Sequence, residues 1–442
     1  MHTPSEVPRF LRSFRHRNYK LFFGGQLVSL TGTWMQSIAQ SWLVYRLTHS
    51  AELLGLVSFA GQIPVFLFAA VGGAAADRTS RHRIIVWTQT AAMLLAFVLA
   101  ALTLSGRVLV WHIFALAAAL GVVSAFDIPA RQAFVADMVG REDLMNAIAL
   151  NSSMVNGARV VGPAVAGAIV AVVGEGWCFF LNGVSYIAVI AGLLLMQVPR
   201  THAPRGRTTS AGRSALHEIA EGFHFVARTA PIRALLLLLG VVSFTAMPYS
   251  VLMPLFADRI LHGGATALGV LMGASGLGAL GGALSLVARR GIKGLGSWVA
   301  LSTGAFGAAL LLFASSRSLS LSTLLLVPVG AAMMVQMAAS NTLIQAMVPD
   351  ALRGRVMAVY SMMFMGMAPF GALFAGSLAE RIGAPLTVAI GAVASLAAAA
   401  VFAVRLPSLR GEARELIVAQ GMAGGDPPAE VTGPPITASR TA

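Results

Sequence analysis

Long continuous runs of apolar residues dominate this chain, and their length limits the folds open to it more than any other feature. A helix needs about 20 apolar residues to cross the roughly 30 Å hydrocarbon core of a bilayer. Such stretches occur at 21–46, 52–76, 84–104, 108–127, 145–173, 177–197, 234–257, 265–288, 296–315, 319–345, 355–379 and 384–404. Gly and Pro interrupt the seventh and eighth of them. We therefore expect an all-α integral membrane protein with twelve transmembrane helices.

The composition excludes the main alternatives to a membrane protein. Hydrophobic residues make up 57% of the chain and charged residues only 11%, whereas a soluble domain carries about a quarter charged residues. A soluble enzyme, a disordered chain and a disulfide scaffold are excluded, and the single cysteine, Cys178, can form no internal disulfide. A spanning β-barrel is disfavoured, because its strands would alternate apolar and polar residues.

The positive charge of the chain, +14 overall, indicates how it lies in the membrane. With the N-terminus inside, 25 of the 31 Lys and Arg residues fall in cytoplasmic segments, five fall outside, and Arg159 alone lies within a span. Cytoplasmic loops collect Lys and Arg. We therefore expect an inner-membrane protein with both termini cytoplasmic, whose charge requires no nucleic-acid partner.

Polar segments divide the chain into five parts. We expect a basic cytoplasmic arm (1–20), a six-helix bundle (21–198), a cytoplasmic linker (199–231), a second six-helix bundle (232–405) and a disordered cytoplasmic tail (406–442). Within the linker, apolar residues between Leu216 and Ala227 recur at helical spacing. This pattern predicts an amphipathic helix along the inner membrane surface that tethers the two halves.

The two halves also resemble each other in sequence. At an offset of 209 residues, Gly162 and Gly167 match Gly371 and Gly376, and the matches extend from Met138-Val139 with Met347-Val348 through the fifth and eleventh spans. Duplicated six-helix units are one architecture of transporters, with the substrate site between the halves. The alternative is chance similarity between helices rich in Gly and Ala.

The segment after the second span reads GAAADRTSRHR, residues 73–83. It resembles the signature between the second and third helices of the major facilitator superfamily, with Ser80 in place of the second glycine. The residues at motif positions are Gly73, Asp77, Arg78 and Arg81, and Arg83 continues the basic run. Gly73 would permit close helix approach, and Asp77 could meet a helix N-terminus, where negative charge is favoured. The resemblance implies that this loop latches the halves together in the outward-open state; the alternative is a solvated basic loop.

A second resemblance covers residues 9–405. The segments 126–132, 145–151, 158–167 and 348–355 are similar to the enterobactin-exporter-like branch of the superfamily. Gly162-Pro163 with Gly167, close to Arg159, also resembles the fifth-helix motif of drug antiporters. The resemblance implies two pseudo-symmetric bundles and alternating access. The alternative for the motif is simple helix packing, since Gly and Pro are common in membrane helices.

Arg159 is the most informative single residue, because a cation within a span is costly and is usually paired or faces a cavity. The candidate partner nearest in sequence is Asp127, at the cytoplasmic end of the fourth predicted span, although Asp127 could equally pair with Arg131 at i+4. No carboxylate lies deep within any predicted span. Asp127 and Arg159 are our coupling candidates, and proton coupling rests on the resemblance alone.

The resemblance implies that spans one, four, seven and ten line a central cavity. Span one supports this, because polar residues including Gln36 and Gln40 form a stripe on an otherwise apolar helix. Tyr249 on span seven, with Gln336 and Asn341 on span ten, completes the candidate lining. The alternative is hydrogen bonding between helices without substrate contact.

The chain lacks the motifs of other energy-coupled or catalytic proteins. Neither lysine, Lys20 nor Lys293, follows a glycine, so there is no P-loop. No zinc-type His/Cys spacing or nucleophile constellation appears, so we expect no enzyme, metal or cofactor. The sequence favours a monomeric exporter of a small amphiphilic molecule, drug- or siderophore-like, with protons and membrane lipids as further partners. The alternatives are a metabolite importer or uniporter of the same fold, and a non-transporting receptor or scaffold.

Overall fold

The computed structural model describes residues 9–197, 215–289 and 291–420, and its regular structure in these ranges is helical. The first half contains η1 (Arg9–Arg15), α1 (Arg17–Thr48), α2 (Ala51–Arg78), α3 (Arg81–Leu104), α4 (Val110–Val173) and α5 (Glu175–Leu194). The second half contains α6 (Ala215–Arg228), α7 (Ala230–Thr245), η2 (Met247–Ser250), α8 (Met253–Leu255), η3 (Phe256–Ile260), α9 (Gly264–Val287), α10 (Leu295–Ser315), α11 (Leu319–Met347), α12 (Asp350–Ser361), η4 (Met362–Gly366), α13 (Met367–Ile382) and α14 (Ala384–Ala419).

Twelve membrane-spanning helices follow from these elements, as the sequence predicts. Within the described residues, eleven helices are long and apolar enough to cross a bilayer. The twelfth is α1, whose 32 residues are long enough but whose polar stripe lowers its hydropathy. Two spans lie in α4, 110–140 and 142–173, because Gly140 adopts a φ of 70° and turns the chain between them. Glycine reaches positive φ without the steric cost of a Cβ.

The seventh span is broken and the eighth is not. Between Thr245 and Ile260 the seventh span passes from α7 through η2 and α8 to η3, close to Pro248 and Pro254. Proline cannot donate the backbone hydrogen bond of a regular helix. The eighth span, whose apolar run is interrupted by glycines, is a continuous helix, because α9 runs from Gly264 to Val287. Its glycines serve close helix contacts instead.

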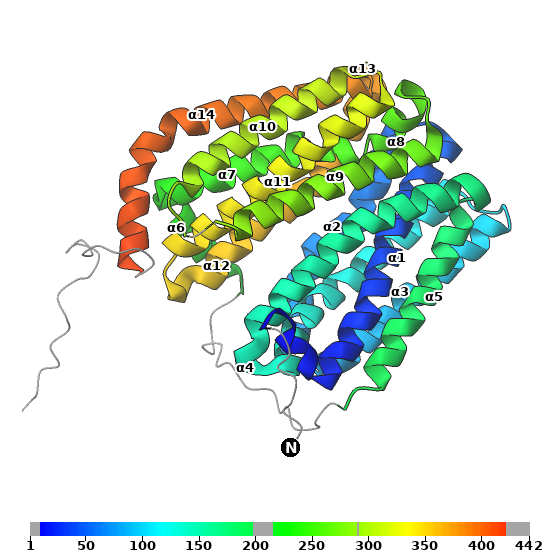
Figure 1. Ribbon diagram of the computed structural model, residues 1–442, viewed down its shortest axis with the longest axis horizontal. Coiled ribbons are helices and arrows are strands. Elements are labelled where there is room, and N and C mark those ends of the chain that lie inside the picture. Colours follow the sequence, from blue (N-terminus) through cyan, green and yellow to red (C-terminus); the bar gives the residue numbers. More distant parts are fainter. Residues whose placement is uncertain (1–8, 198–214, 290, 421–442) are drawn as a thin grey trace, which may run out of the picture.

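The helices form two bundles that meet at one end and diverge at the other (Figure 1). We call the end that carries η1, the turn at Gly140, α6 and the start of α12 the arm end. The opposite end, which carries the connections 49–50, 174, 261–263 and 383, is the distal end. The bundles touch through α4 against α9 and through α2 against α13, near α13 and α8 in Figure 1.

The internal repeat is visible in equivalent glycine contacts. A Cβ added at Gly162 would lie 2.5 Å from the Cβ of Trp34 in α1, and one added at Gly371 would lie 2.4 Å from the carbonyl oxygen of Phe244 in α7. Across the bundle interface, a Cβ at Gly167 would lie 2.9 Å from the Gly269 Cα. Similarly, a Cβ at Gly376 would lie 3.0 Å from the Gly55 Cα. The matched glycines therefore occupy matched positions.

The linker helix and the tail differ in part from expectation. The amphipathic helix is present as α6, and it packs on α12, where Glu221 pairs with Arg355 at 2.8 Å. The prediction of disorder from residue 406 is wrong for 406–419, because α14 continues to Ala419. The helix bends in this last part (Figure 1), which contains Pro407, and the Glu412 carboxylate accepts a hydrogen bond from the Ala230 backbone. The other parts of the predicted tail and linker, 421–442 and 199–214, lie outside the described residues, as does 1–8 of the arm.

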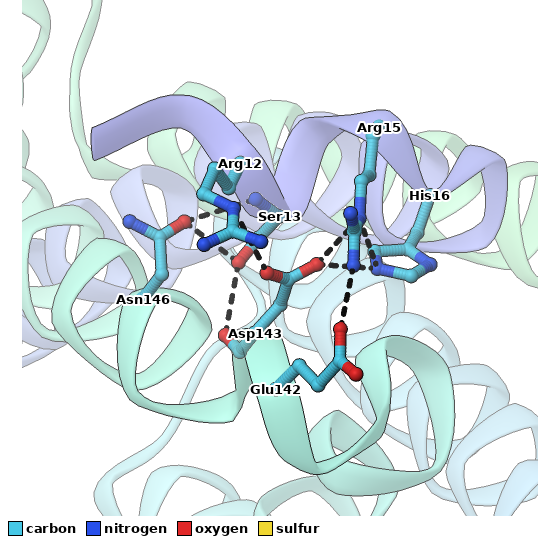
Figure 2. A network of polar contacts seen from close by, with 7 residues as sticks. All are labelled: Arg12, Ser13, Arg15, His16, Glu142, Asp143 and Asn146. Atoms are coloured by element: carbon cyan, nitrogen blue, oxygen red, sulfur yellow. Dashed lines mark hydrogen bonds and ion pairs between the residues drawn. The ribbon is translucent and has the colours of Figure 1, made fainter. Parts of the chain in front are cut away.

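The basic arm is fastened to the arm end of the first bundle (Figure 2). The Asp143 side chain is 1% exposed and meets Arg15 at 2.7 Å, His16 at 2.8 Å and Arg12 at 3.6 Å. The Ser13 backbone and hydroxyl both donate to Asn146. The arm is thus held by the start of the fifth span rather than lying free in solvent.

Candidate functional site

A cavity of about 510 Å³ lies between the two bundles. Both halves contribute to its wall, since its lining includes Gln36, Gln40 and Tyr249. Apart from Arg159, its other polar lining residues are Thr33, Ser37, Ser41, Ser58, Gln62, Ser124, Asn182, Tyr186, Ser250 and Ser275. The apolar part of the wall contains Trp34, Ile38, Val44, Leu54, Val57, Met247, Val251, Met272 and Met333. Such a wall suits a ligand that is partly apolar and partly polar.

A second hollow of about 710 Å³ lies toward the arm end. It is lined from the second span of α4 by Asn151, Ser152, Val155 and Asn156, and from the second bundle by residues that include Leu286, Arg289, Met334 and Met337. Arg159 lines both hollows. Arg159 therefore stands between the hollow toward the arm end and the cavity between the bundles.

Arg159 lies near the middle of the second span of α4, and the structure gives it an aromatic partner. Its guanidinium carbon is 5.1 Å from the centre of the Trp34 ring, which is a cation–π contact. Of the two partners that the sequence left open for Asp127, the structure selects Arg131, with which Asp127 forms an ion pair at 3.1 Å. In the described part of the chain, no carboxylate forms an ion pair with Arg159.

Asp127 lies deeper than the sequence suggested. The fourth span continues to Gly140, thirteen residues further, which places Asp127 about 20 Å from the end of that helix at 1.5 Å per residue. Asp127 is 6% exposed and accepts hydrogen bonds from Thr88 at 2.8 Å and Gln89 at 2.9 Å. The expectation that Asp127 sits at the end of its helix is therefore wrong.

Pro129 is the reason for this error. Proline disfavours a helical residue before it, so the sequence places the end of the span near Ile128, whereas α4 continues through Pro129. The i, i+4 spacing of Asp127 and Arg131 was the signal that the helix continues. Arg131 is consequently inside the span as well, and it donates to Gln26 on α1 at 3.1 Å.

The predicted lining residues divide into two groups. Gln36 accepts a hydrogen bond from Asn182 at 2.7 Å, and the Tyr249 hydroxyl lies 2.9 Å from that of Ser275, so both are held in place at the cavity wall. Gln336 and Asn341 line neither hollow, and the expectation that they do is wrong for this conformation. Gln336 is 2% exposed, because α11 packs between α9 and α10 and buries that face.

Two lining residues that sequence reasoning missed are Trp34 and Asn182. Trp34 lies one position after Thr33 of the polar stripe, and a lone aromatic on a membrane helix carries little signal. Asn182 is an amide within the sixth span, which the expected lining by spans one, four, seven and ten leaves out. An intramembrane amide needs a partner, and this requirement was the signal that could have found it.

The motif after the second span is not engaged with the second bundle. Asp77 is exposed and its ion-pair partner is Arg81 at 3.6 Å. Arg81 also binds Asp137 of the first bundle, at 2.9 and 3.0 Å. Ser80, which departs from the family pattern, caps α3, because its hydroxyl accepts from the Arg83 backbone N–H. Arg78 and Arg83 are exposed.

The close helix approach expected at Gly73 occurs one residue earlier. A Cβ at Gly72 would lie 2.1 Å from the Ala125 carbonyl oxygen of α4, whereas nothing lies within 4 Å of a Cβ at Gly73. The prediction for Gly73 is wrong because helical geometry turns it about 100° away from the face that Gly72 presents to α4.

The fifth-helix motif lies at the interface between the bundles. Pro163 lines the cavity and cannot donate to the Arg159 carbonyl oxygen one turn before it. That oxygen would lie 2.9 Å from a Cβ at Gly276 of α9. Proline and the small residues thus bring the second span of α4 and α9 close together beside the cavity.

Polar contacts join the two bundles at the distal end. The Tyr45 hydroxyl donates to Asp258 at 2.7 Å, and Arg259 donates to the His49 carbonyl oxygen at 2.7 Å. Glu380 accepts hydrogen bonds at the N-terminus of α2, from the Ser50 hydroxyl at 3.1 Å and from the backbone N–H groups of Ala51 at 2.7 Å and Glu52 at 3.3 Å. These contacts hold the two bundles together at the distal end.

Comparison with known proteins adds a family to this geometry. The family model of transmembrane secretion effectors matches residues 10–424. The chain is 25% identical to the staphyloferrin A transporter of Staphylococcus aureus, over 87% of this chain and 95% of that protein. It is 26% identical to the enterobactin exporter of Shigella boydii, over 86% and 88% of the two chains. It is 27% identical to the multidrug efflux pump Tap of Mycolicibacterium fortuitum, over 81% and 88%.

Solved structures share the fold. A bacterial homologue of the iron transporter ferroportin, in an inward-facing state, has a TM-score of 0.64 at 17% identity and covers 88% of this chain and 98% of its own. The nucleoside transporter NupG has a TM-score of 0.69 at 16% identity, over 90% and 99% of the two chains. At these identities the likeness concerns the fold alone.

Proposed function

The chain belongs to the transmembrane secretion effectors, a family of multi-pass transporters in the major facilitator superfamily, and from this premise we propose that it exports a small amphiphilic molecule by proton antiport. It is a transporter and not an enzyme. The observation that carries the proposal is the pair of hollows that Arg159 lines, one toward the arm end and one between the bundles, together with the contacts of Tyr45 with Asp258 and of Glu380 with α2 that join the bundles at the distal end.

The proposed transport cycle is alternating access between two halves that are built alike. The paired glycine contacts of α4 with α9 and of α13 with α2 lie toward the distal end. Both would loosen if the bundles rocked to open that end. A single chain contains the whole cavity, so we propose a monomer as the working unit, surrounded by membrane lipids.

We place the arm end in the cytoplasm of the cell and the protein in its inner membrane. Lys and Arg concentrate at the arm end, which fits the bias of cytoplasmic loops. Arg131 lies within α4 rather than in a loop, and the bias of Lys and Arg toward the arm end remains when Arg131 is left out of the count. The conformation described here is then inward-facing, with the cavity open to the compartment that supplies an exported substrate.

Asp127 is the residue we propose for proton binding. It is buried within α4, and protonation would cancel its ion pair with Arg131 and weaken its hydrogen bonds to Thr88 and Gln89. Arg159 cannot fill this role directly, since a guanidinium stays protonated in proteins. We therefore assign Arg159 to the substrate path and Asp127 to the proton.

The motif of Gly73, Asp77, Arg78, Arg81 and Arg83 is proposed as the gate of the arm end. In this conformation Asp77 is exposed and Arg81 is bound within its own bundle. Closure of the arm end would bring Asp77 to the second bundle, where a helix N-terminus would stabilise its charge. Substitution Asp77→Asn should then disfavour the outward-open state and leave this one unchanged.

Inverted membrane vesicles provide the test. An acidic lumen should drive uptake of a substrate found by screening dyes, drugs and siderophores, and collapse of the gradient should stop uptake. Asp127→Asn should abolish gradient-driven uptake and keep exchange down a substrate gradient. Glu52→Gln, which changes an exposed carboxylate at the distal end, should keep both activities. Uptake that persists without the gradient would exclude antiport and favour a uniporter. Binding without any flux would favour a receptor.

A further inference from the structure

We infer that the cavity takes an organic anion, whose acidic group pairs with Arg159 while its apolar part lies in the central hollow. The inference rests on the proposed function only in treating the cavity as the substrate site. It goes beyond that function because amphiphilic substrates include cations and neutral molecules, and it selects among them.

The first step is the charge of the cavity. Among the described residues that line the two hollows there is no Asp or Glu, and the charged side chains are Arg159 and Arg289. A path through a membrane protein that contains only positive groups attracts anions and repels cations. Arg289 belongs to the arm-end hollow, so the attraction begins where a cytoplasmic substrate would enter.

The second step is the unmet need of Arg159. A cation in the middle of a span is normally paired or wet, yet the carboxylate closest in sequence, Asp127, is already bound to Arg131, Thr88 and Gln89. The Trp34 ring lies 5.1 Å from the Arg159 guanidinium carbon but offers it no oxygen. The N–H donors of a guanidinium match a carboxylate in a bidentate pair.

The third step is the surroundings of that pair. Trp34, Met272 and Met333 provide apolar wall in the cavity that Arg159 lines, and Gln40 offers an amide group that can donate to a further oxygen of a ligand. An acid with an aromatic or alkyl body meets both kinds of wall. A cationic amphiphile would place its charge beside Arg159 with no carboxylate in the lining to receive it.

The test uses two probes that differ only in charge, 1-naphthylacetate and 1-naphthylacetamide, with the purified full-length protein in nanodiscs of uncharged lipid. We expect the acid to bind about tenfold more tightly than the amide to the native chain, which corresponds to about 1.4 kcal/mol. The acid should weaken as NaCl rises from 50 to 500 mM, while the amide should not. Equal affinities for the two probes, or a tighter amide, would overturn the inference without any variant.

Variants then locate the anion site. Arg159→Gln should reduce the acid to the affinity of the amide while leaving the amide unchanged, and Arg159→Lys should keep part of the preference. Arg107→Gln, which removes an exposed charge at the distal end, should keep all of it. If the Arg159→Gln variant still prefers the acid to the amide, the anion site lies elsewhere and the inference fails.

The two proposals fail separately. If acid binding depends on Arg159 but no compound crosses vesicle membranes, export is wrong and the anion site stands. If a cationic or neutral dye is exported with gradient dependence while naphthylacetate binding ignores Arg159, export stands and the anion site is wrong.

Discussion

The arm end and the distal end differ in how their carboxylates are bound. At the arm end, charges are satisfied within one half: Asp143 by the arm, Asp137 by Arg81, and Glu221 by Arg355. At the distal end Glu175 is also bound within one half, by Arg46 at 2.7 Å, but Asp258 and Glu380 are satisfied across the bundle interface. The difference teaches that the arm end can separate without leaving charges unpaired, whereas opening the distal end breaks specific hydrogen bonds.

The largest effect is expected at the arm end, on stability. Asp143→Asn removes the charge that holds Arg12, Arg15 and His16, and the Asp143 side chain is buried while the arginines are about half-exposed. We expect the unfolding free energy to fall, though by less than the loss of a fully buried pair would cost, because water screens the arginines. The melting temperature of the purified protein measures this, with Asp77→Asn as the matched control. An equal drop in both variants would show that the arm contributes nothing specific.

The next effect is steric and belongs to the distal end. Gly167→Val forces a side chain against the Gly269 backbone, which costs about 1–3 kcal/mol in the closed distal state. The distal-open population should rise about 10- to 100-fold. Labelling of Ser41→Cys in a Cys178→Ser background with a membrane-impermeant maleimide from outside measures this population. Gly157→Val, on the same span but facing open space, should leave labelling unchanged, and matching behaviour of the two variants would remove the interface from the gate.

A smaller effect on the same labelling is expected from Tyr45→Phe. It deletes the hydroxyl that donates to the Asp258 carboxylate, worth about 1.5 kcal/mol, and should raise distal opening about tenfold. Tyr360→Phe makes the same chemical change within the second bundle, where the hydroxyl donates to the Met337 carbonyl oxygen. A rise in labelling for Tyr360→Phe as large as for Tyr45→Phe would contradict the distinction between the two ends.

The smallest effect is expected from Glu380→Gln. The amide can still accept from the N-terminus of α2 but loses the favourable interaction of a negative charge with the helix dipole, about 0.5–1 kcal/mol. Distal opening should rise two- to fivefold by the same labelling. Glu142→Gln should have no effect, because the Glu142 carboxylate meets Arg15 within the first bundle. A decrease in labelling for Glu380→Gln would contradict the prediction that Glu380 stabilises the closed distal end.

The sequence predicts the topology of this fold well and the gate poorly, for physical reasons. Spans are local features of about 20 residues, and matched glycines such as Gly167 and Gly376 are repeated in sequence because both halves need the same close contact. Tyr45 and Asp258 are 213 residues apart, and no pattern within either segment indicates their contact. Asp127 was placed too near a helix end because a proline inside a membrane helix is tolerated more often than its local geometry implies.

The docked arm also has a consequence for the synthesis of the chain. Ser13 and Asp143 are separated by 130 residues, so the arm has no partner until the start of the fifth span has left the ribosome. At ordinary elongation rates this takes roughly 10 s, and during this time the first four spans must enter the bilayer while the basic arm has no partner to bind. The contacts of the arm with Asp143 therefore form only after most of the first bundle is inserted, and well before the second bundle is made.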